Sequence, residues 1–366
     1  MDRSRLESLL RRFPALTVLV VGDFFLDKYL LINPQLAEIS LETGLEAHQV
    51  VEVRCNPGAA GTVTANLRAL GVNVLALGVI GDDGESYELK RALRAISVDA
   101  SLLIECADRF TPTYTKPMRP AASRGGEWQE LNRLDIKNRM PLPAKVEDAI
   151  ITHLREALPG VQGAVIADQV SEADCGVITG RVRAELCALA RLYPHKAFAA
   201  DSRERIGLYQ DVILKCNARE AVRAVLPAGD PTDRRVIETC GTALATRARR
   251  PVFVTLGAEG IWLFDESGGE RVPTRPAAGP IDPVGAGDSV MAGLVSALCA
   301  GASPREAAIV GNLAASVTIE QIGTTGTASP TQVLRQFEAT YCPNPPPPLP
   351  ASPRARPPAR PGGQRC

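Results

Sequence analysis

The stretch Ile281-Asp282-Pro283-Val284-Gly285-Ala286-Gly287-Asp288-Ser289 is the most informative part of this sequence. The apolar residues that follow, Val290 to Leu298, recur at helical spacing, so the stretch is predicted to open a helix. The two glycines remove Cβ atoms where a backbone must come close to a ligand. Free N–H groups and the positive end of the helix dipole make such a turn able to hold phosphate oxygens. We call residues 285–288 the anion turn.

Asp288 is unusual in an anion site, because a carboxylate repels a phosphate unless it takes a proton. It is therefore a candidate general base for a hydroxyl group that attacks a phosphoryl group. The alternative is an acidic residue that only benefits from the dipole at a helix N-terminus, by up to about 1 kcal/mol. The anion turn alone does not separate the two interpretations.

Upstream of the anion turn, short apolar runs that end in turn residues alternate with helical patterns. Wholly apolar strands separated by helices are typical of an α/β fold, in which a mostly parallel sheet is covered on both faces. The expected strands are Thr17–Val21, Asn73–Ile80, Ala164–Ala167, Lys196–Ala200, Val212–Leu214 and Val252–Thr255, and the expected helices include Ala60–Leu70 and Glu85–Ile96. Ser303-Pro304-Arg305-Glu306 is a capping box that predicts a helix to about Glu320.

Two stretches, 28–54 and 111–135, interrupt this alternation with polar, irregular and partly alternating sequence. Both follow strand ends, where ligands bind in such sheets. We expect them to form a small β layer that covers the site, and we call it the lid. Two long surface loops are the alternative, although loops longer than about 15 residues in a compact domain are usually functional.

Composition limits the class of protein. Residues 343–366 hold ten prolines, four arginines and no acid, so we expect a disordered tail behind a folded domain at 1–342. Without the tail, 37 basic residues face 41 acidic ones, which does not suggest a nucleic-acid partner. No apolar run approaches the ~20 residues of a membrane helix, and the N-terminus lacks a secretory pattern. A cytoplasmic protein is expected.

Six motifs, in order along the chain, resemble the ribokinase-like (PfkB) carbohydrate kinases. The first four are Val20-Val21-Gly22-Asp23-Phe24-Phe25-Leu26-Asp27, the glycine-rich run 57–67, Gly78-Val79-Ile80-Gly81-Asp82-Asp83 and Lys215-Cys216-Asn217-Ala218-Arg219-Glu220. The last two are Thr255-Leu256-Gly257-Ala258-Glu259-Gly260 and the anion turn itself. The resemblance implies a ribokinase-like fold with a small β lid, and an enzyme that uses ATP and Mg²⁺ to phosphorylate a sugar or sugar phosphate.

On the phosphate side, the resemblance makes Asp288 the base and the N–H groups of Gly285, Ala286 and Gly287 the anion hole. It places Asn217 and Glu220 near phosphates and Mg²⁺, although a capping box predicts the same spacing. Thr255, Gly257 and Gly260 would approach the nucleotide, and a plain strand–turn–strand would use the same glycines. The resemblance also places Asn312 near the adenine and Asp282 at a monovalent cation such as K⁺.

On the sugar side, Asp27 and Asp23 would contact hydroxyl groups, together with Gly58, Thr62 and Asn66 of the glycine-rich run. An Asp after a Gly can also simply end a strand. Within the family, the heptose-7-phosphate kinase type is most similar, on Thr113-x-Thr115-Lys116 and Arg133-Leu134-Asp135. Lys116, Arg119 and Arg133 could then pair with a phosphate on the sugar. Exposed lid cations without that role are the alternative.

The sequence departs from the family pattern on the sugar side only. Ala59 replaces a glycine, Thr62 replaces a sugar-contacting asparagine, and 168–174 replaces a glycine-rich segment. Which sugar is bound is therefore open, and a nucleoside kinase of the same fold or a non-catalytic sugar-binding relative are alternatives. No Gly-x-Gly-x-x-Gly follows the first strand, which excludes a dinucleotide-dependent dehydrogenase. The resemblance also implies a homodimer formed through the lid.

Overall fold

The computed structural model describes residues 1–121, 128–277, 279–323 and 325–341. Its main sheet has nine strands in the spatial order β16-β15-β14-β13-β12-β11-β1-β6-β7. Their bounds are β1 Thr17–Gly22, β6 Asn73–Gly81, β7 Asp99–Cys106, β11 Gly163–Asp168, β12 Ala197–Ser202, β13 Ile213–Asn217, β14 Val252–Thr255, β15 Ile261–Asp265 and β16 Gly268–Val272. Every neighbouring pair from β7 to β14 in this order is parallel, whereas β15 is antiparallel to both of its neighbours, β14 and β16. The fold class predicted from the sequence is confirmed.

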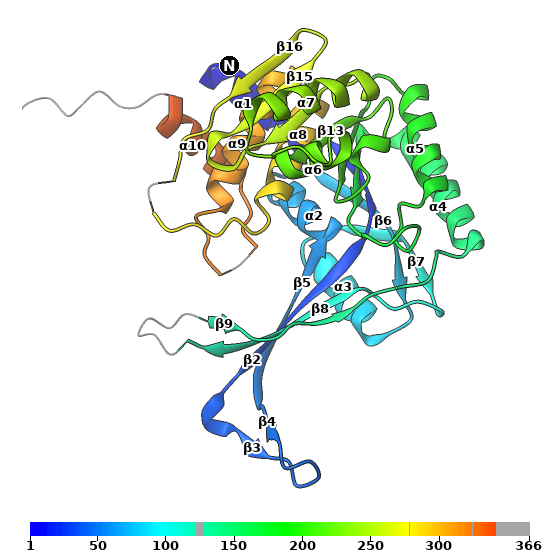
Figure 1. The fold of residues 1–366 in the computed structure, drawn as a ribbon, viewed down its shortest axis with the longest axis vertical. Coiled ribbons are helices and arrows are strands. Elements are labelled where there is room, and N and C mark those ends of the chain that lie inside the picture. The colour runs from blue at the N-terminus through cyan, green and yellow to red at the C-terminus, as the bar shows by residue number, and fades with distance from the viewer. Residues whose placement is uncertain (122–127, 278, 324, 342–366) are drawn as a thin grey trace, which may run out of the picture.

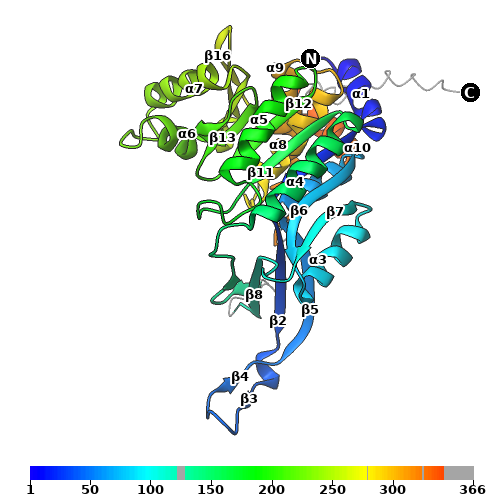
Figure 2. The same ribbon diagram turned by 90° about the vertical axis from the view of Figure 1, so that its right-hand side faces the viewer.

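Helices cover both faces of this sheet, as Figure 2 shows. One hydrophobic core lies under α1 Arg3–Arg12, α2 Ala60–Ala69, α3 Gly84–Ala95, α8 Ala286–Cys299, α9 Pro304–Thr318 and α10 Pro330–Tyr341. The other core lies under α4 Ala144–Ala157, α5 Gly180–Leu192, α6 Ala218–Val225 and α7 Arg234–Ala248. Burial on both faces explains why the central strands are apolar throughout rather than alternating.

A second sheet projects from the main body (Figure 1). Its strands are β2 Phe24–Ile32, β5 Val50–Ala59, β8 Thr113–Pro120, β9 Trp128–Glu130 and β10 Leu134–Ile136, in the order β10-β8-β2-β5 with β9 beside β8. The short strands β3 Glu38–Ile39 and β4 Glu46–Ala47 form its tip. The first lid segment was expected at 28–54, but its strands span 24–59. It begins earlier because β2 follows β1 after a single residue, Asp23, and it ends later because β5 continues to Ala59.

The main sheet places its carboxyl ends beside this second sheet. Gly22 permits the change of direction after β1, since a Cβ there would lie 2.2 Å from the carbonyl oxygen of Ala167. The crevice at the carboxyl ends is where ligands bind in open α/β sheets. The predicted tail, residues 343–366, lies outside the described residues. Within the described ranges, none of the helices has the length and apolar character needed to cross a bilayer.

Candidate active site

The anion turn opens α8 as the glycine pattern predicted. Gly285 is the N-cap residue and has φ +80°, in the left-handed region that favours glycine. A Cβ at Gly285 would lie 2.8 Å from Cγ2 of Thr325 and 3.5 Å from Cγ2 of Thr62. The start of α2, which carries Thr62, therefore borders the anion turn. Asp288 lies in the first turn of the helix.

The environment of Asp288 changes its acidity. Burial raises its pKa to about 7, the nearby Asp201 and Asp27 also raise it, and Lys215 and Arg203 oppose them. A carboxyl group with this pKa takes and releases a proton near neutral pH, as a general base must. An exposed acid at a helix N-terminus lacks this property, so the raised pKa of Asp288 is compatible with the base interpretation.

A cavity on one side of the anion turn brings together six predicted residues. It is lined by Thr255, Gly257 and Gly260, by Asn312, and by Ala286 and Gly287 of the anion turn, with apolar side chains such as Ile281 and Val290 between them. An apolar cleft with a few polar groups beside an anion site suits a nucleotide. Gly260 also has a structural role, because a Cβ there would lie 2.3 Å from the carbonyl oxygen of Val272. Both interpretations of these glycines are therefore compatible with the structure.

Asn217 and Glu220 form a capping box at the start of α6. The amide N–H of Asn217 donates to Oε2 of Glu220 at 2.8 Å, and that of Glu220 donates to Oδ1 of Asn217 at 2.9 Å. Burial and the negative charge of Asp201 raise the pKa of Glu220. Glu220 keeps its second carboxylate oxygen, and Oδ1 of Asn217 keeps a second lone pair, for a ligand.

The carboxylate of Asp282 accepts hydrogen bonds from two backbone N–H groups, one of them just before the anion turn and one from a distant segment. Its carboxylate accepts the N–H of Val284 at 3.1 Å and that of Gly323 at 3.3 Å. These contacts brace the segment that leads into Gly285. Within the described ranges, no three His, Cys, Asp or Glu side chains gather into a cluster that could hold a metal ion.

Asp27 on β2 is paired with a lysine. Its Oδ1 lies 2.9 Å from Nζ of Lys116 on β8, and both side chains are largely buried, at 14% and 13% exposure. Nζ of Lys116 also lies 4.7 Å from the centre of the Tyr29 ring. A Cβ on Gly58 would lie 2.6 Å from Oδ2 of Asp27, so the glycine makes room for this carboxylate. Lys116 is therefore not an exposed lid cation.

The other two predicted lid cations are also engaged. Arg133 makes two hydrogen bonds to Asp135, at 2.6 and 2.9 Å, and lies 4.0 Å from the centre of the Tyr114 ring. Arg119 donates to Oε1 of Gln129 from two nitrogens at 3.3 Å. Of the three, Lys116 lies closest to a predicted sugar-binding residue.

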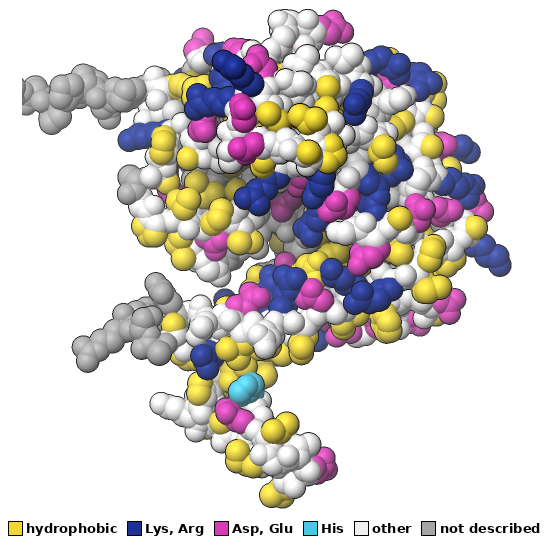
Figure 3. Space-filling view, in the orientation of Figure 1, with side chains coloured by type: hydrophobic (Ala, Val, Ile, Leu, Met, Phe, Trp, Pro, Cys, Tyr) yellow, Lys and Arg dark blue, Asp and Glu magenta, His cyan; other side chains and the backbone are white. Residues whose placement is uncertain are grey.

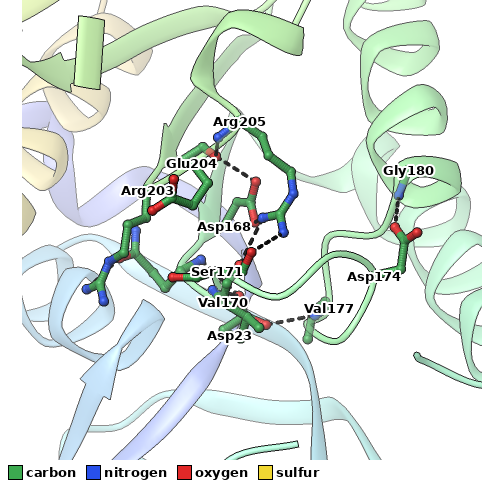
Figure 4. A network of polar contacts seen from close by, with 12 residues as sticks. Asp23, Asp168, Val170, Ser171, Asp174, Val177, Gly180, Arg203, Glu204 and Arg205 are labelled. Carbon is green, nitrogen blue, oxygen red and sulfur yellow. Dashed lines mark hydrogen bonds and ion pairs between the residues drawn. The ribbon is translucent and has the colours of Figure 1, made fainter. Parts of the chain in front are cut away.

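Asp23 and Asn66 have structural roles that the sequence analysis did not predict. Asp23, 3% exposed, accepts the N–H groups of Gln169, Val170 and Val177 at 2.7–3.1 Å (Figure 4). Burial raises its pKa to about 6. Oδ1 of Asn66 accepts the hydroxyl of Ser289 at 3.0 Å, which joins α2 to α8 behind the anion turn. Both residues hold backbone in place around the site.

The segment that departs from the family pattern is held from two sides. Asp23 holds it on one side, and on the other Arg205 donates to the carbonyl oxygens of Val170 and Ser171, both at 2.8 Å. Arg205 also pairs with buried Asp168 at 3.2 Å, as Figure 4 shows. The segment lines a second cavity, whose other walls include Phe25, Tyr114 and Arg203. This cavity lies beside Asp23 and the start of the second sheet.

Sequence reasoning missed Lys215 and Asp201. Lys215 is 6% exposed, its Nζ lies 2.6 Å from Oδ2 of Asp201, and a Cβ on Gly287 would lie 2.8 Å from the same Nζ. Burial disfavours its charge, but Asp201 and Asp288 outweigh burial, so the pKa of Lys215 is raised. A charged residue within an apolar strand run was the signal available in the sequence.

Comparisons with known proteins agree with this arrangement. The model of the pfkB family carbohydrate kinases matches residues 184–332, which include the anion turn. The bifunctional protein HldE of Trichlorobacter lovleyi is 29% identical over 337 residues, which is 91% of this chain and 65% of HldE. This chain thus spans slightly less than two thirds of the length of that relative.

Two solved structures have the same fold. Phosphofructokinase-2 from Escherichia coli, in complex with potassium, superposes with a TM-score of 0.66 at 17% identity over 88% of this chain and 99% of that one. Ribokinase from Arabidopsis thaliana, complexed with ribose and ATP, gives a TM-score of 0.64 at 16% identity over the same shares, 88% and 99%. With the likeness to HldE, these findings lead to one conclusion: the chain has a ribokinase-like fold and is similar to the pfkB family carbohydrate kinases over residues 184–332.

Proposed function

We propose that this protein transfers the γ-phosphoryl group of ATP to a hydroxyl group of a sugar or sugar phosphate, with Asp288 as the general base. The observation that carries the proposal is the position of Asp288, in the anion turn and beside the cavity suited to a nucleotide, with a pKa of about 7. Asp288 would take the hydroxyl proton while the oxygen attacks phosphorus. The N–H groups of the anion turn would stabilise the charge on the moving phosphoryl group.

Sugar binding is assigned to the Asp27 side of the crevice. Asp27 with Gly58, and Thr62 beside the anion turn, would contact hydroxyl groups. Heptose 7-phosphate is the first acceptor to test, because the motifs around Thr113 and Arg133 resemble that kinase type. Lys116 supports a charged acceptor, since its ammonium lies beside Asp27 and could pair with a phosphate.

Mg²⁺ fits the residues near the phosphates. Glu220 and Asn217 offer carboxylate and amide oxygens, the hard ligands that this ion takes in small number while it keeps waters and substrate phosphates. When bound, the ion would neutralise phosphate charge. A monovalent cation such as K⁺ would lie near Asp282, whose carboxylate already braces the anion turn.

A homodimer is part of the proposal. Among the described strands, β5 is an edge of the second sheet, and its Val50, Val51 and Val53 are exposed. Figure 3 shows hydrophobic side chains on this projecting sheet, away from the main body. An exposed apolar edge strand pairs readily with another strand. The occupant we assign to it is the same sheet of a second copy.

The test is turnover of Mg·ATP with a panel of heptose, hexose and pentose sugars and nucleosides, each with and without phosphate. We expect one acceptor class to react, and Asp288→Asn to lower kcat about 10²–10⁴-fold, the usual contribution of a general base. The rate should rise with pH through about 7 in the wild type as Asp288 ionises, and this limb should be absent in the variant.

Asp265→Asn, at a turn after β15, is the matched control and should react like the wild type. Tight binding of sugar and ATP without turnover would instead identify a non-catalytic relative. Turnover on nucleosides alone would show that the acceptor is a nucleoside and not a sugar or sugar phosphate.

A further inference from the structure

The Lys215–Asp201 pair is a buried ion pair that the mechanism above does not use. The two residues lie on neighbouring strands, Lys215 in the middle of β13 and Asp201 next to the last residue of β12, and they are 6% and 7% exposed. Nζ of Lys215 lies 2.6 Å from Oδ2 of Asp201. Removing two charges from water is costly, and an ion pair in such a place is rarely the most stable solution. Its position therefore calls for a functional reason.

The lysine ammonium lies against the anion turn. A Cβ on Gly287 would come within 2.8 Å of Nζ, so only glycine leaves room for this approach. An ammonium has three N–H donors. Among the residues that the structure describes, Asp201 is the one side chain that accepts a hydrogen bond from Nζ. Donors thus remain at the place where the anion turn would hold a phosphoryl group.

The charge balance of the site gives this cation a role. Asp288, Asp201, Asp27 and Glu220 bring negative charge to the crevice, and the phosphates of a nucleotide add more. An acidic site accepts a polyphosphate only where fixed cations oppose this charge. Lys215 is such a cation, and it is rigidly held because its partner is buried with it.

We propose that Lys215 is a further catalytic residue, whose ammonium donates to the phosphoryl group during transfer, and that Asp201 is the residue that positions it. The inference rests on the function proposed above. The bond from the acceptor oxygen to phosphorus forms as the bond to the leaving ADP oxygen breaks. The hydroxyl proton goes to Asp288, and Lys215 keeps its protons throughout.

A purely structural role makes a different prediction. If Lys215 only neutralises Asp201, then replacing both residues with neutral ones removes the buried negative charge and also the need for a positive charge beside it. Activity should then be kept. Lys215→Met alone leaves a buried carboxylate without a partner, which is destabilising in either case. The double variant Lys215→Met/Asp201→Asn separates the two roles, because it leaves no unpaired charge.

The experiment measures kcat and KM for the wild type, Asp201→Asn, Lys215→Met and the double variant, with thermal unfolding of each. We expect the double variant to fold and to have kcat about 10²–10³-fold below the wild type, the loss found when one donor to a transition-state anion is removed. Asp201→Asn alone should lose less, since the ammonium remains. Recovery of kcat by the double variant to within about threefold of the wild type would overturn the proposal.

Binding gives a readout that needs no turnover. The double variant should bind ADP as the wild type does, but should lose at least about tenfold in affinity for a non-hydrolysable ATP analogue, because only the analogue carries the terminal phosphoryl group. Equal affinities for the analogue would contradict a contact with that group. Lys196→Met is the control, because Lys196 precedes β12 at the opposite end of the sheet and bonds to backbone carbonyls.

A pH profile distinguishes this inference from the proposed function. Asp288 is faced by Lys215 from β13, by Asp201 and Arg203 at the end of β12, and by Asp27 from β2. Lys215 lowers the pKa of Asp288, so its replacement in Lys215→Met should raise that pKa. The rise of kcat with pH should then occur at higher pH than in the wild type. A wild type without turnover on any acceptor would refute the proposed function, whereas the binding comparison would still decide the role of Lys215.

Discussion

At the scale of single residues, the anion turn depends on backbone that only glycine adopts without strain. Gly285 has φ +80°, and Gly287 leaves room for an ammonium. Both features follow from the absence of a Cβ, which is why the sequence alone predicted a turn that approaches a ligand. The role of Asp288, in the first turn of the helix, could not be assigned without its surroundings, because burial raises its pKa.

Gly285→Ala should damage both the turn and its function. An alanine there would carry a left-handed φ and a Cβ 2.8 Å from Cγ2 of Thr325. We expect kcat to fall at least about tenfold, and the free energy of unfolding to fall by about 1–3 kcal/mol, from backbone strain. Kinetics and urea denaturation measure the two effects.

Gly160→Ala is the matched control, because nothing lies within 4 Å of a Cβ built there and its φ is not in the left-handed region. It should be close to the wild type in both assays. A Gly285→Ala protein with unchanged kcat would argue against the anion hole.

The partners of the predicted site residues could not be read from the sequence. Asp27 and Lys116 are far apart in the chain and meet only because β2 and β8 pair in parallel. Asp23 resembles a sugar contact by its place in a motif, yet its carboxylate is used by three backbone N–H groups of another segment. Motifs identify residue types, whereas tertiary contacts decide which lone pairs remain available.

At the scale of elements, the sequence predicted helix and strand boundaries correctly where a capping motif, or a change in the spacing of apolar residues, marked the end of an element. The capping box at Ser303 opens α9, and the strand at 252–255 has the predicted bounds. The second sheet was predicted as a small β layer, but its start was placed at 28 instead of 24, because Gly22-Asp23 signals the end of β1 and does not show that β2 begins directly after it. Edge strand β7, half-buried, was missed because its apolar run, 102–104, is only three residues long.

The ion pair between α1 and α9 predicts a pH-dependent contribution to stability. A hydrogen bond from Arg5 lowers the pKa of Glu306 to about 2, and the two side chains lie 2.9 Å apart. A carboxyl whose folded pKa lies below its unfolded value adds stability above that unfolded value, and the contribution is lost as pH falls towards the folded pKa. Glu306→Gln should therefore lower Tm at pH 7, by a few degrees, and have no effect near pH 2.

Thermal unfolding followed by circular dichroism at several pH values measures this difference. Glu156→Gln, on the exposed side of α4, is the control and should leave Tm unchanged throughout. A Glu306→Gln deficit that persisted at low pH would show that the capping box, and not the ion pair with Arg5, provides the stability.

At the scale of the whole molecule, the projecting sheet is the feature that a single copy explains least well. Its outer edge carries exposed valines on β5, and the tip adds exposed Ile39, Leu41 and Leu45 (Figure 1). Apolar surface of this kind on a projecting element is typical of an interface. We expect the protein to be a dimer in sedimentation experiments and Val51→Glu/Val53→Glu to be a monomer.

The charge change should leave the unfolding of the main body unaltered, because β5 keeps its pairing with β2. Leu192→Glu, at a similarly exposed apolar residue on α5, should remain a dimer. A wild type that sediments as a monomer would remove the dimer from the proposed function.

The contacts of α1 affect how the protein folds while it is being synthesised. Arg3 pairs with Glu338 of α10 and Arg5 with Glu306 of α9, and these helices share one hydrophobic core, near the N label in Figure 2. A ribosome delivers α1 roughly three hundred residues before α9 and α10. The part of this core that α8, α9 and α10 cover therefore stays exposed until translation has passed α10, and during this interval the nascent chain is a natural client for chaperones.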